Sequence, residues 1–114
     1  MIIKTFEFNE KGICTLIRGD TAEFSLDVYV QGIKLETFEA KFSVKQYFDD
    51  DAYLFQVNFN QSTPCYITRA LTQSLPYGDY WYDVQVTYVD DKGSTQYKTI
   101  GAFPFILKPD VTGN

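Results

Sequence analysis

The feature that most constrains the fold is a leucine, a glycine and two alternating tyrosines in the order Leu-x-x-Gly-x-Tyr-x-Tyr. These residues are Leu75, Gly78, Tyr80 and Tyr82. Glycine adopts backbone angles that other residues avoid, so Gly78 favours a tight turn. Successive side chains of a strand point to opposite faces, so the alternating tyrosines indicate that a strand begins here. The motif therefore predicts a sharp corner that leads into a strand.

The strand after this corner, residues 79–89, is predicted to have one apolar face and one mixed face. The apolar face carries Tyr80, Tyr82, Val84, Val86 and Tyr88. Trp81 and Val89 belong to the opposite face, since they are out of phase with that series. A large aromatic residue on an outer face is a frequent anchor for a partner, because interfaces are enriched in Trp and Tyr. We therefore take Trp81, with Val89 and Tyr29, as interface candidates, against the alternative that the N-terminal segment or a loop covers Trp81.

The other strands are predicted from alternation and from turn residues. Residues 90–94 form a hairpin turn in which Gly93 takes positive φ, and the partner strand runs from about residue 95 to 107. Gly101 and Pro104 within it predict a bulge or an edge position. Further strands are expected at residues 2–8, 13–17, 22–30, 38–45, 52–59 and 64–70. This pattern predicts seven or eight strands and no helix.

Composition and length agree with a single all-β domain. The chain has 114 residues, of which 45% are hydrophobic and 18% aromatic, and aromatic residues favour half-buried pleated surfaces. The Leu-x-x-Gly-x-Tyr-x-Tyr corner is typical of the immunoglobulin-like sandwich, in which a tyrosine hydroxyl binds nearby backbone; Tyr80 is the better candidate and Tyr82 the second. The predicted fold is an immunoglobulin-like β-sandwich of seven to eight antiparallel strands, spanning residues 1–114 with a short flexible tail from about residue 110.

Charge and hydropathy argue against two classes of partner. The formal net charge is −5, which repels a phosphate backbone, so we expect no nucleic-acid partner. No segment reaches the roughly 18 to 20 apolar residues of a membrane span, and the N-terminus lacks an apolar run of signal length. We therefore expect a soluble protein made in the cytoplasm, without a membrane partner.

The residues that usually carry catalysis are scarce. The chain has no histidine, the commonest general base and transition-metal ligand. Cys14 and Cys65 lack activating neighbours and are expected to be free, buried thiols rather than a disulfide. Asp49, Asp50 and Asp51 could join Asp90 and Asp91 around a hard cation, but solvated loops are the favoured interpretation. We predict no enzyme activity, no cofactor and no metal.

Several segments together resemble the immunoglobulin-like domain of phage baseplate and related virion structural proteins. The resemblance spans about residues 18 to 112 and rests on Arg18-Gly19-Asp20-Thr21, Phe42 to Lys45, Leu75-x-x-Gly78-x-Tyr80-x-Tyr82-Asp83-Val84, Lys98-Thr99-Ile100-Gly101-x-Phe103 and Asp110-Val111-Thr112. In the upper-baseplate family this module stands at the N-terminus, ahead of receptor-binding parts. The resemblance implies a tail, baseplate, neck or head-decoration component without catalytic residues.

The expected function is therefore that of a non-catalytic virion structural or assembly protein. Its partners would be other virion proteins, with a homo-oligomer as a further expectation, and its location would be the virion after synthesis in the bacterial host cytoplasm. The alternative is a carbohydrate- or cell-surface-binding module in which Trp81, Tyr29 and Tyr77 form a sugar platform.

Overall fold

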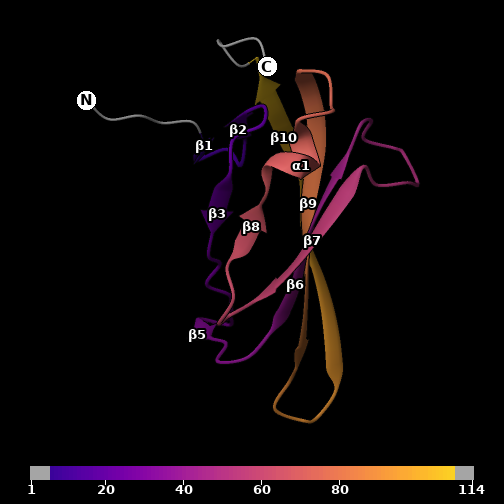
Figure 1. The fold of residues 1–114 in the computed structure, drawn as a ribbon. Helices are drawn as coiled ribbons and strands as arrows, with labels where there is room; N and C mark the ends of the chain where they lie inside the picture. The colour runs from indigo at the N-terminus through magenta and orange to yellow at the C-terminus, as the bar shows by residue number, and fades with distance from the viewer. Residues whose placement is uncertain (1–5, 110–114) are drawn as a thin grey trace.

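A computed structural model of the chain describes residues 6–109, which form ten strands and one short helix (Figure 1). The elements are β1 (Phe6–Phe8), β2 (Cys14–Ile17), β3 (Ala22–Phe24), β4 (Tyr29–Val30), β5 (Ile33–Lys34), β6 (Glu39–Lys45), β7 (Phe55–Asn60), β8 (Cys65–Ile67), α1 (Arg69–Thr72), β9 (Gly78–Val89) and β10 (Thr95–Lys108). The predicted all-β class is confirmed. The tail predicted from about residue 110, and residues 1–5 of the first predicted strand, lie outside the described residues.

The strands form one large sheet and two small ones. The six-stranded sheet has the order β1-β2-β10-β9-β6-β7, and β3-β8 and β4-β5 form two-stranded sheets. All pairs are antiparallel except β2 with β10, where Cys14 to Ile17 run parallel to Phe105 to Lys108. The expectation of seven to eight strands, all antiparallel, was therefore wrong. Periodicity indicates which residues are buried, but it indicates neither strand direction nor where a ladder stops.

Strand β9 is the centre of the large sheet and follows the predicted alternation. It pairs with β6 along Glu39–Lys45 and with β10 along its whole length, from Gly78 to Val89. The turn that joins β9 to β10 is held by Asp90, whose Oδ1 accepts hydrogen bonds from the backbone N–H groups of Lys92 and Ser94. Gly93 has φ 82° there, as expected, so a residue with a side chain would be strained in this turn.

The interruption predicted in the last strand is present. The register of β10 against β9 shifts between Gly101 and Phe103, which is a β-bulge. Gly101 has φ 122°, and a Cβ on it would lie 3.0 Å from the carbonyl oxygen of Tyr82. A side chain at position 101 would therefore be disfavoured both by the backbone conformation and by the neighbouring strand.

Three strand predictions were too long, and one of them, at residues 52–59, starts only at Phe55 of β7. Residues 22–30 do not form one strand: β3 stops at Phe24, and β4 begins at Tyr29. Leu26 and Val28 between them are partly buried against the core without a ladder of their own. Residues 64–70 contain β8 and then the start of α1, a helix that the sequence did not predict. Thr72 of this helix is fully buried, and its Oγ1 accepts the Gly19 N–H at 2.9 Å.

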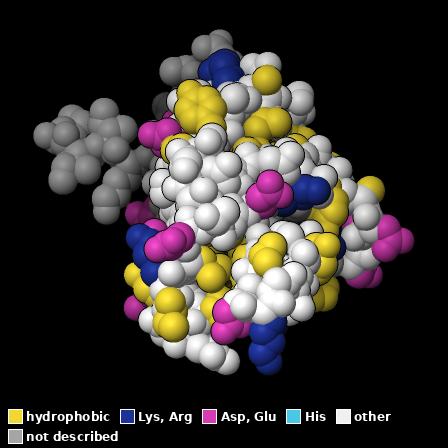
Figure 2. Space-filling model, turned by 90° about the horizontal axis from the view of Figure 1, so that it is seen from below, with side chains coloured by type: hydrophobic (Ala, Val, Ile, Leu, Met, Phe, Trp, Pro, Cys, Tyr) yellow, Lys and Arg dark blue, Asp and Glu magenta, His cyan; other side chains and the backbone are white. Residues whose placement is uncertain are grey.

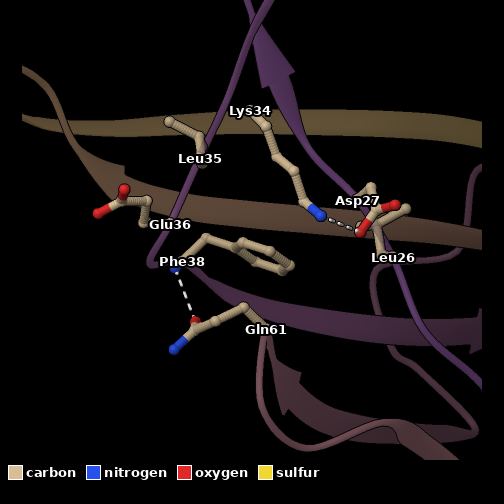
Figure 3. A pocket seen from close by; sticks show the side chains of 7 residues that line it. All are labelled: Leu26, Asp27, Lys34, Leu35, Glu36, Phe38 and Gln61. Carbon is tan, nitrogen blue, oxygen red and sulfur yellow. Dashed lines mark hydrogen bonds and ion pairs between the residues drawn. The ribbon is translucent and has the colours of Figure 1, made fainter.

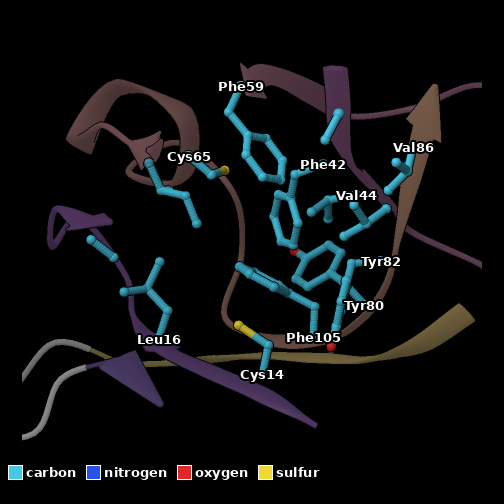
Figure 4. Packing of buried hydrophobic residues seen from close by; sticks show 14 of the residues in the cluster. Cys14, Leu16, Phe42, Val44, Phe59, Cys65, Tyr80, Tyr82, Val86 and Phe105 are labelled. Atoms are coloured by element: carbon cyan, nitrogen blue, oxygen red, sulfur yellow. The ribbon is translucent and has the colours of Figure 1, made fainter. Parts of the chain in front are cut away.

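The core lies between the large sheet and the β3-β8 pair. Phe42 of β6 is fully buried, and its ring lies 5.5 Å from Phe24 of β3, 5.2 Å from Tyr82 of β9 and 6.2 Å from Phe105 of β10, between ring centroids. Figure 4 shows the rings of Phe42, Tyr82 and Phe105 grouped together, with the sulfur atoms of Cys14 and Cys65 among the packed side chains. Both cysteines are free and buried, as the sequence predicted.

Candidate interaction surface

Trp81 lies on the face of β9 that points away from the core. Its neighbours along the strand, Tyr80 and Tyr82, are each only 5% exposed, whereas Trp81 is half-buried on the other face. Directly across the ladders it faces Lys45 of β6 and Pro104 of β10. Trp81 therefore lies on a central strand of the large sheet, near the start of that strand.

A loop aromatic packs against Trp81. Residues 46–54 connect β6 to β7, and Phe48 in this loop places its ring edge-to-face on Trp81, with 5.5 Å between centroids and 76° between the ring planes. Phe48 remains 62% exposed. The loop covers part of Trp81, in agreement with the covered-residue alternative, yet it also adds an exposed aromatic ring beside it.

A second aromatic of the same loop extends this surface. The Lys45 ammonium lies 5.3 Å from the centroid of the Tyr53 ring, which is within the range of a cation–π contact. Lys45 is also the cross-strand neighbour of Trp81. We call the contiguous group Trp81, Phe48, Lys45 and Tyr53 the Trp81 patch.

The surroundings of the Trp81 patch are mainly acidic. Asp83 is on the same face of β9; burial raises the pKa of its carboxyl, and Lys45 partly offsets that effect. Asp49, Asp50 and Asp51 belong to the loop that carries Phe48. One of them is structural, because Asp50 Oδ2 accepts the Tyr47 N–H at 3.1 Å. The patch thus combines exposed rings, one ammonium group and a border of carboxylates.

The other two interface candidates lie elsewhere. Val89 ends β9, eight residues after Trp81 and so about 26 Å along the strand. It lines an open hollow together with Val30 and Ile33 of the β4-β5 pair, and Tyr29 belongs to that pair. Seen from below, hydrophobic side chains are scattered among charged ones (Figure 2). The structure therefore brings Tyr29 and Val89 to one end of the molecule and Trp81 to the other.

The three residues of the sugar platform are not assembled either. Tyr77 precedes β9, and its ring lies 5.3 Å from the guanidinium carbon of Arg18. Tyr29 is on β4, at the far end from Trp81. Among the described residues, no ring contact joins Trp81, Tyr29 and Tyr77. A sugar that stacks on Trp81 would meet Phe48 and Tyr53 instead.

An open hollow of about 490 Å³ is bordered by the β3–β4 connection and by the segment that runs from β5 into β6 (Figure 3). It is lined by Leu26, Asp27, Lys34, Leu35, Glu36, Phe38 and Gln61. Some of its polar groups are paired: Lys34 Nζ lies 3.4 Å from Asp27 Oδ1, and Gln61 Oε1 accepts the Phe38 N–H at 2.9 Å, whereas the Glu36 carboxylate is exposed.

The two acidic loops are far apart. Lys45 pairs with Trp81 and Glu39 with Thr87, so the loop after β6 lies at the opposite end of β9 from Asp90 and Asp91. The shared cation site considered from the sequence is therefore not formed. Within residues 6–109, no group of three or more His, Cys, Asp or Glu side chains is arranged to hold a metal ion. In the same part of the chain, no helix has the length and hydropathy of a membrane span.

The corner before β9 is held by the Tyr80 hydroxyl, and the Tyr82 hydroxyl joins β9 to the connection between β1 and β2. Tyr80 Oη donates to the carbonyl oxygen of Pro76, four residues upstream, and Tyr82 Oη donates to that of Gly12. Leu75 is partly buried against the core, and its N–H donates to the carbonyl oxygen of Thr72 at 3.0 Å. Gly78 begins the strand with φ 151°, a conformation that favours glycine.

Replacing the corner hydroxyl tests how much it contributes. We expect Tyr80→Phe to lower the free energy of unfolding by about 1 to 2 kcal/mol, because the Pro76 carbonyl loses its donor. Urea unfolding measures this difference, and Tyr66→Phe, at an exposed tyrosine on β8, is the matched control. Equal urea midpoints for Tyr80→Phe and the parent protein would contradict the assignment.

The sequence interpretation missed the loop aromatics. It took residues 49–51 as an acidic loop without assigning a role to Phe48 or Tyr53 on either side of them. One signal was present, because residues 46–54 contain four large apolar side chains that a solvated loop does not need: Tyr47, Phe48, Tyr53 and Leu54. Their position beside Trp81 depends on the pairing of β6 with β9, which a single sequence does not reveal.

Comparisons with protein-family models, with curated proteins and with solved structures found no match to this chain.

Proposed function

We propose that the protein is a non-catalytic structural or assembly component of a phage virion, in the tail, baseplate, neck or head decoration. It acts by binding other virion proteins through the Trp81 patch. The observation that carries the proposal is the edge-to-face pair of Trp81 and Phe48, of which Phe48 is largely exposed, on the outer face of a central strand. Aromatic residues of this kind are enriched at the centres of protein interfaces.

The finer fold assignment belongs to the same proposal. An immunoglobulin-like sandwich is supported by the Tyr80 hydroxyl bond to Pro76, which has the form of a tyrosine corner. It is further supported by the β3-β8 pair, whose Phe24 packs on Phe42 of the large sheet. Because β9 has a buried inner face, its outer face can bind a partner without disturbing the core.

The proposal is tested by measuring separately whether the protein binds virion proteins and whether it binds sugars. Immobilised protein is incubated with proteins released from virions of the phage that encodes it, and the same preparation is applied to a glycan array. We expect a virion protein to be retained and the array to give no signal. Retention of glycans without any virion protein would contradict the proposal and favour the carbohydrate-binding alternative.

A further inference from the structure

The first half of β10 leaves one side of the large sheet open. β10 pairs with β9 along its whole length, but β2 pairs only with Phe105 to Lys108. Within residues 6–109, no strand pairs with Thr95 to Ile100 on the side away from β9. This part of the β9–β10 hairpin extends beyond the rest of the molecule at the bottom of Figure 1. A row of backbone N–H and C=O groups is therefore available to another strand.

This edge lacks most of the features that block edge pairing. Proteins protect edges with proline, charged side chains, bulges or short strands. The segment from Thr95 to Ile100 contains no proline and one charge, Lys98, and the bulge begins only at Gly101. Tyr97 is 66% exposed on it. The edge is long enough and accessible enough to take part in a sheet between two chains.

The order of side chains along this edge is self-complementary. In an antiparallel pair of two copies, residues that face each other must belong to the same face. Placing Tyr97 opposite Tyr97 of a second copy brings Thr95 opposite Thr99 and Gln96 opposite Lys98. Aromatic pairs and threonine pairs stabilise neighbouring strands. A second antiparallel register pairs the same number of residues, but it places Lys98 opposite Lys98, which is unfavourable because like charges repel.

Charge complementarity supports the same register. Gln96 Nε2 donates to Asp90 Oδ2 at 3.0 Å, so Gln96 stands beside a carboxylate. Hydrogen bonds from the backbone, first that of Ser94, lower the pKa of the Asp90 carboxyl and keep it ionised. Among the described residues, the Lys98 ammonium has no ion pair or hydrogen bond. In the Tyr97-centred pair, Lys98 of one copy approaches the Gln96–Asp90 pair of the other.

We propose that two copies of this chain associate through the Thr95 to Ile100 edges of β10, antiparallel and centred on Tyr97, so that their large sheets become continuous. The occupant of the edge is thus a second copy of the chain. The inference is independent of the virion role, since it needs no other protein. It also uses a surface separate from the Trp81 patch, which lies on the other side of the bulge at Gly101.

A cysteine cross-link tests the register. In the proposed pair the two Cα atoms of position 97 are about 4.5 to 5.5 Å apart, within the range of a disulfide. Those of position 99 are about 14 Å apart, beyond it. Under mild oxidation we expect Tyr97→Cys to form a covalent dimer in high yield and Thr99→Cys at least tenfold less. Cys14 and Cys65 are fully buried and do not interfere. Cross-linking from position 99 equal to that from 97 would overturn the proposal.

A charge exchange tests the contact without oxidation. The average molar mass of the parent protein, measured by light scattering over a concentration series, is expected to rise towards twice the mass of one chain. Thr95→Lys with Thr99→Lys places like charges opposite each other and should weaken the dimer at least tenfold, whereas Thr95→Lys with Thr99→Glu should restore it. A parent protein that stays monomeric, or a dimer that the two lysines leave unchanged, would overturn the proposal. Trp81→Ala should leave the dimer intact, which separates this result from the virion role.

Discussion

The protein should lose stability steeply as the pH rises from about 9 towards 12. Cys14 and Cys65 are fully buried, and burial raises the pKa of each thiol from the ordinary value of 9.0 to about 12. Above pH 9 the unfolded chain therefore releases protons that the folded chain still holds, so rising pH favours unfolding. The stability from these groups is complete below pH 9. Each thiol should lower the free energy of unfolding by about 1.4 kcal/mol per pH unit in that window.

Urea unfolding at pH values between about 8 and 10.5 measures this slope. The double variant Cys14→Ala with Cys65→Ala is the control: its baseline stability is lower, but its slope above pH 9 should be much smaller. Burial also raises the pKa of Tyr82, from 10.0 to about 12, so a smaller loss should remain in the control above pH 10. A parent protein whose unfolding free energy stays constant from pH 8 to 10.5 would show that the thiols are accessible to solvent.

Trp81→Ala should weaken binding to a virion partner about thirtyfold or more, with a melting temperature close to that of the parent. An aromatic anchor at the centre of an interface typically costs about 2 kcal/mol or more on truncation. Trp81 lies outside the buried core cluster, so its loss removes contacts with Phe48 but no core packing. Titration of the captured partner gives the affinity, and calorimetry gives the melting temperature.

Two further variants make this comparison specific. Phe48→Ala should reduce the affinity less than Trp81→Ala does, because it removes the outer ring of the pair. Thr87→Ala, on the same face of β9 but away from the patch, should change nothing. If Trp81→Ala unfolded the protein, Trp81 would have to be assigned to the core, and the proposed binding face would be abandoned.

The parts of the fold that a single sequence predicts well are those decided locally. Gly78 and the alternating tyrosines determine the corner and the phase of β9, so the burial of Tyr80 and Tyr82 and the outward position of Trp81 follow from periodicity alone. The hairpin turn at Gly93 and the bulge at Gly101 are predicted because glycine is needed at both positions.

The parts that the sequence did not predict depend on distant partners. Residues 22–30 alternate throughout, but β8 is only three residues long, so the ladder stops at Phe24. The parallel pairing of β2 with β10 joins residues about ninety positions apart, and no local pattern indicates its direction. The sequence predicted only part of the Trp81 patch. The outward position of Trp81 follows from local alternation along β9, whereas Phe48 and Tyr53 come near it only through the pairing of β6 with β9.

Photo-cross-linking from the Trp81 patch tests the central claim most directly. A benzophenone amino acid is placed at position 48, beside Trp81, or at position 66 on β8, where Tyr66 is exposed on the other layer of the molecule. Each protein is irradiated with proteins released from virions of the phage that, on the proposed function, encodes it, and the adducts are identified by mass spectrometry. The account predicts an adduct with a virion protein from position 48 and none from position 66. Adducts from position 66 alone, or from neither position, would contradict a protein-binding role for the Trp81 patch.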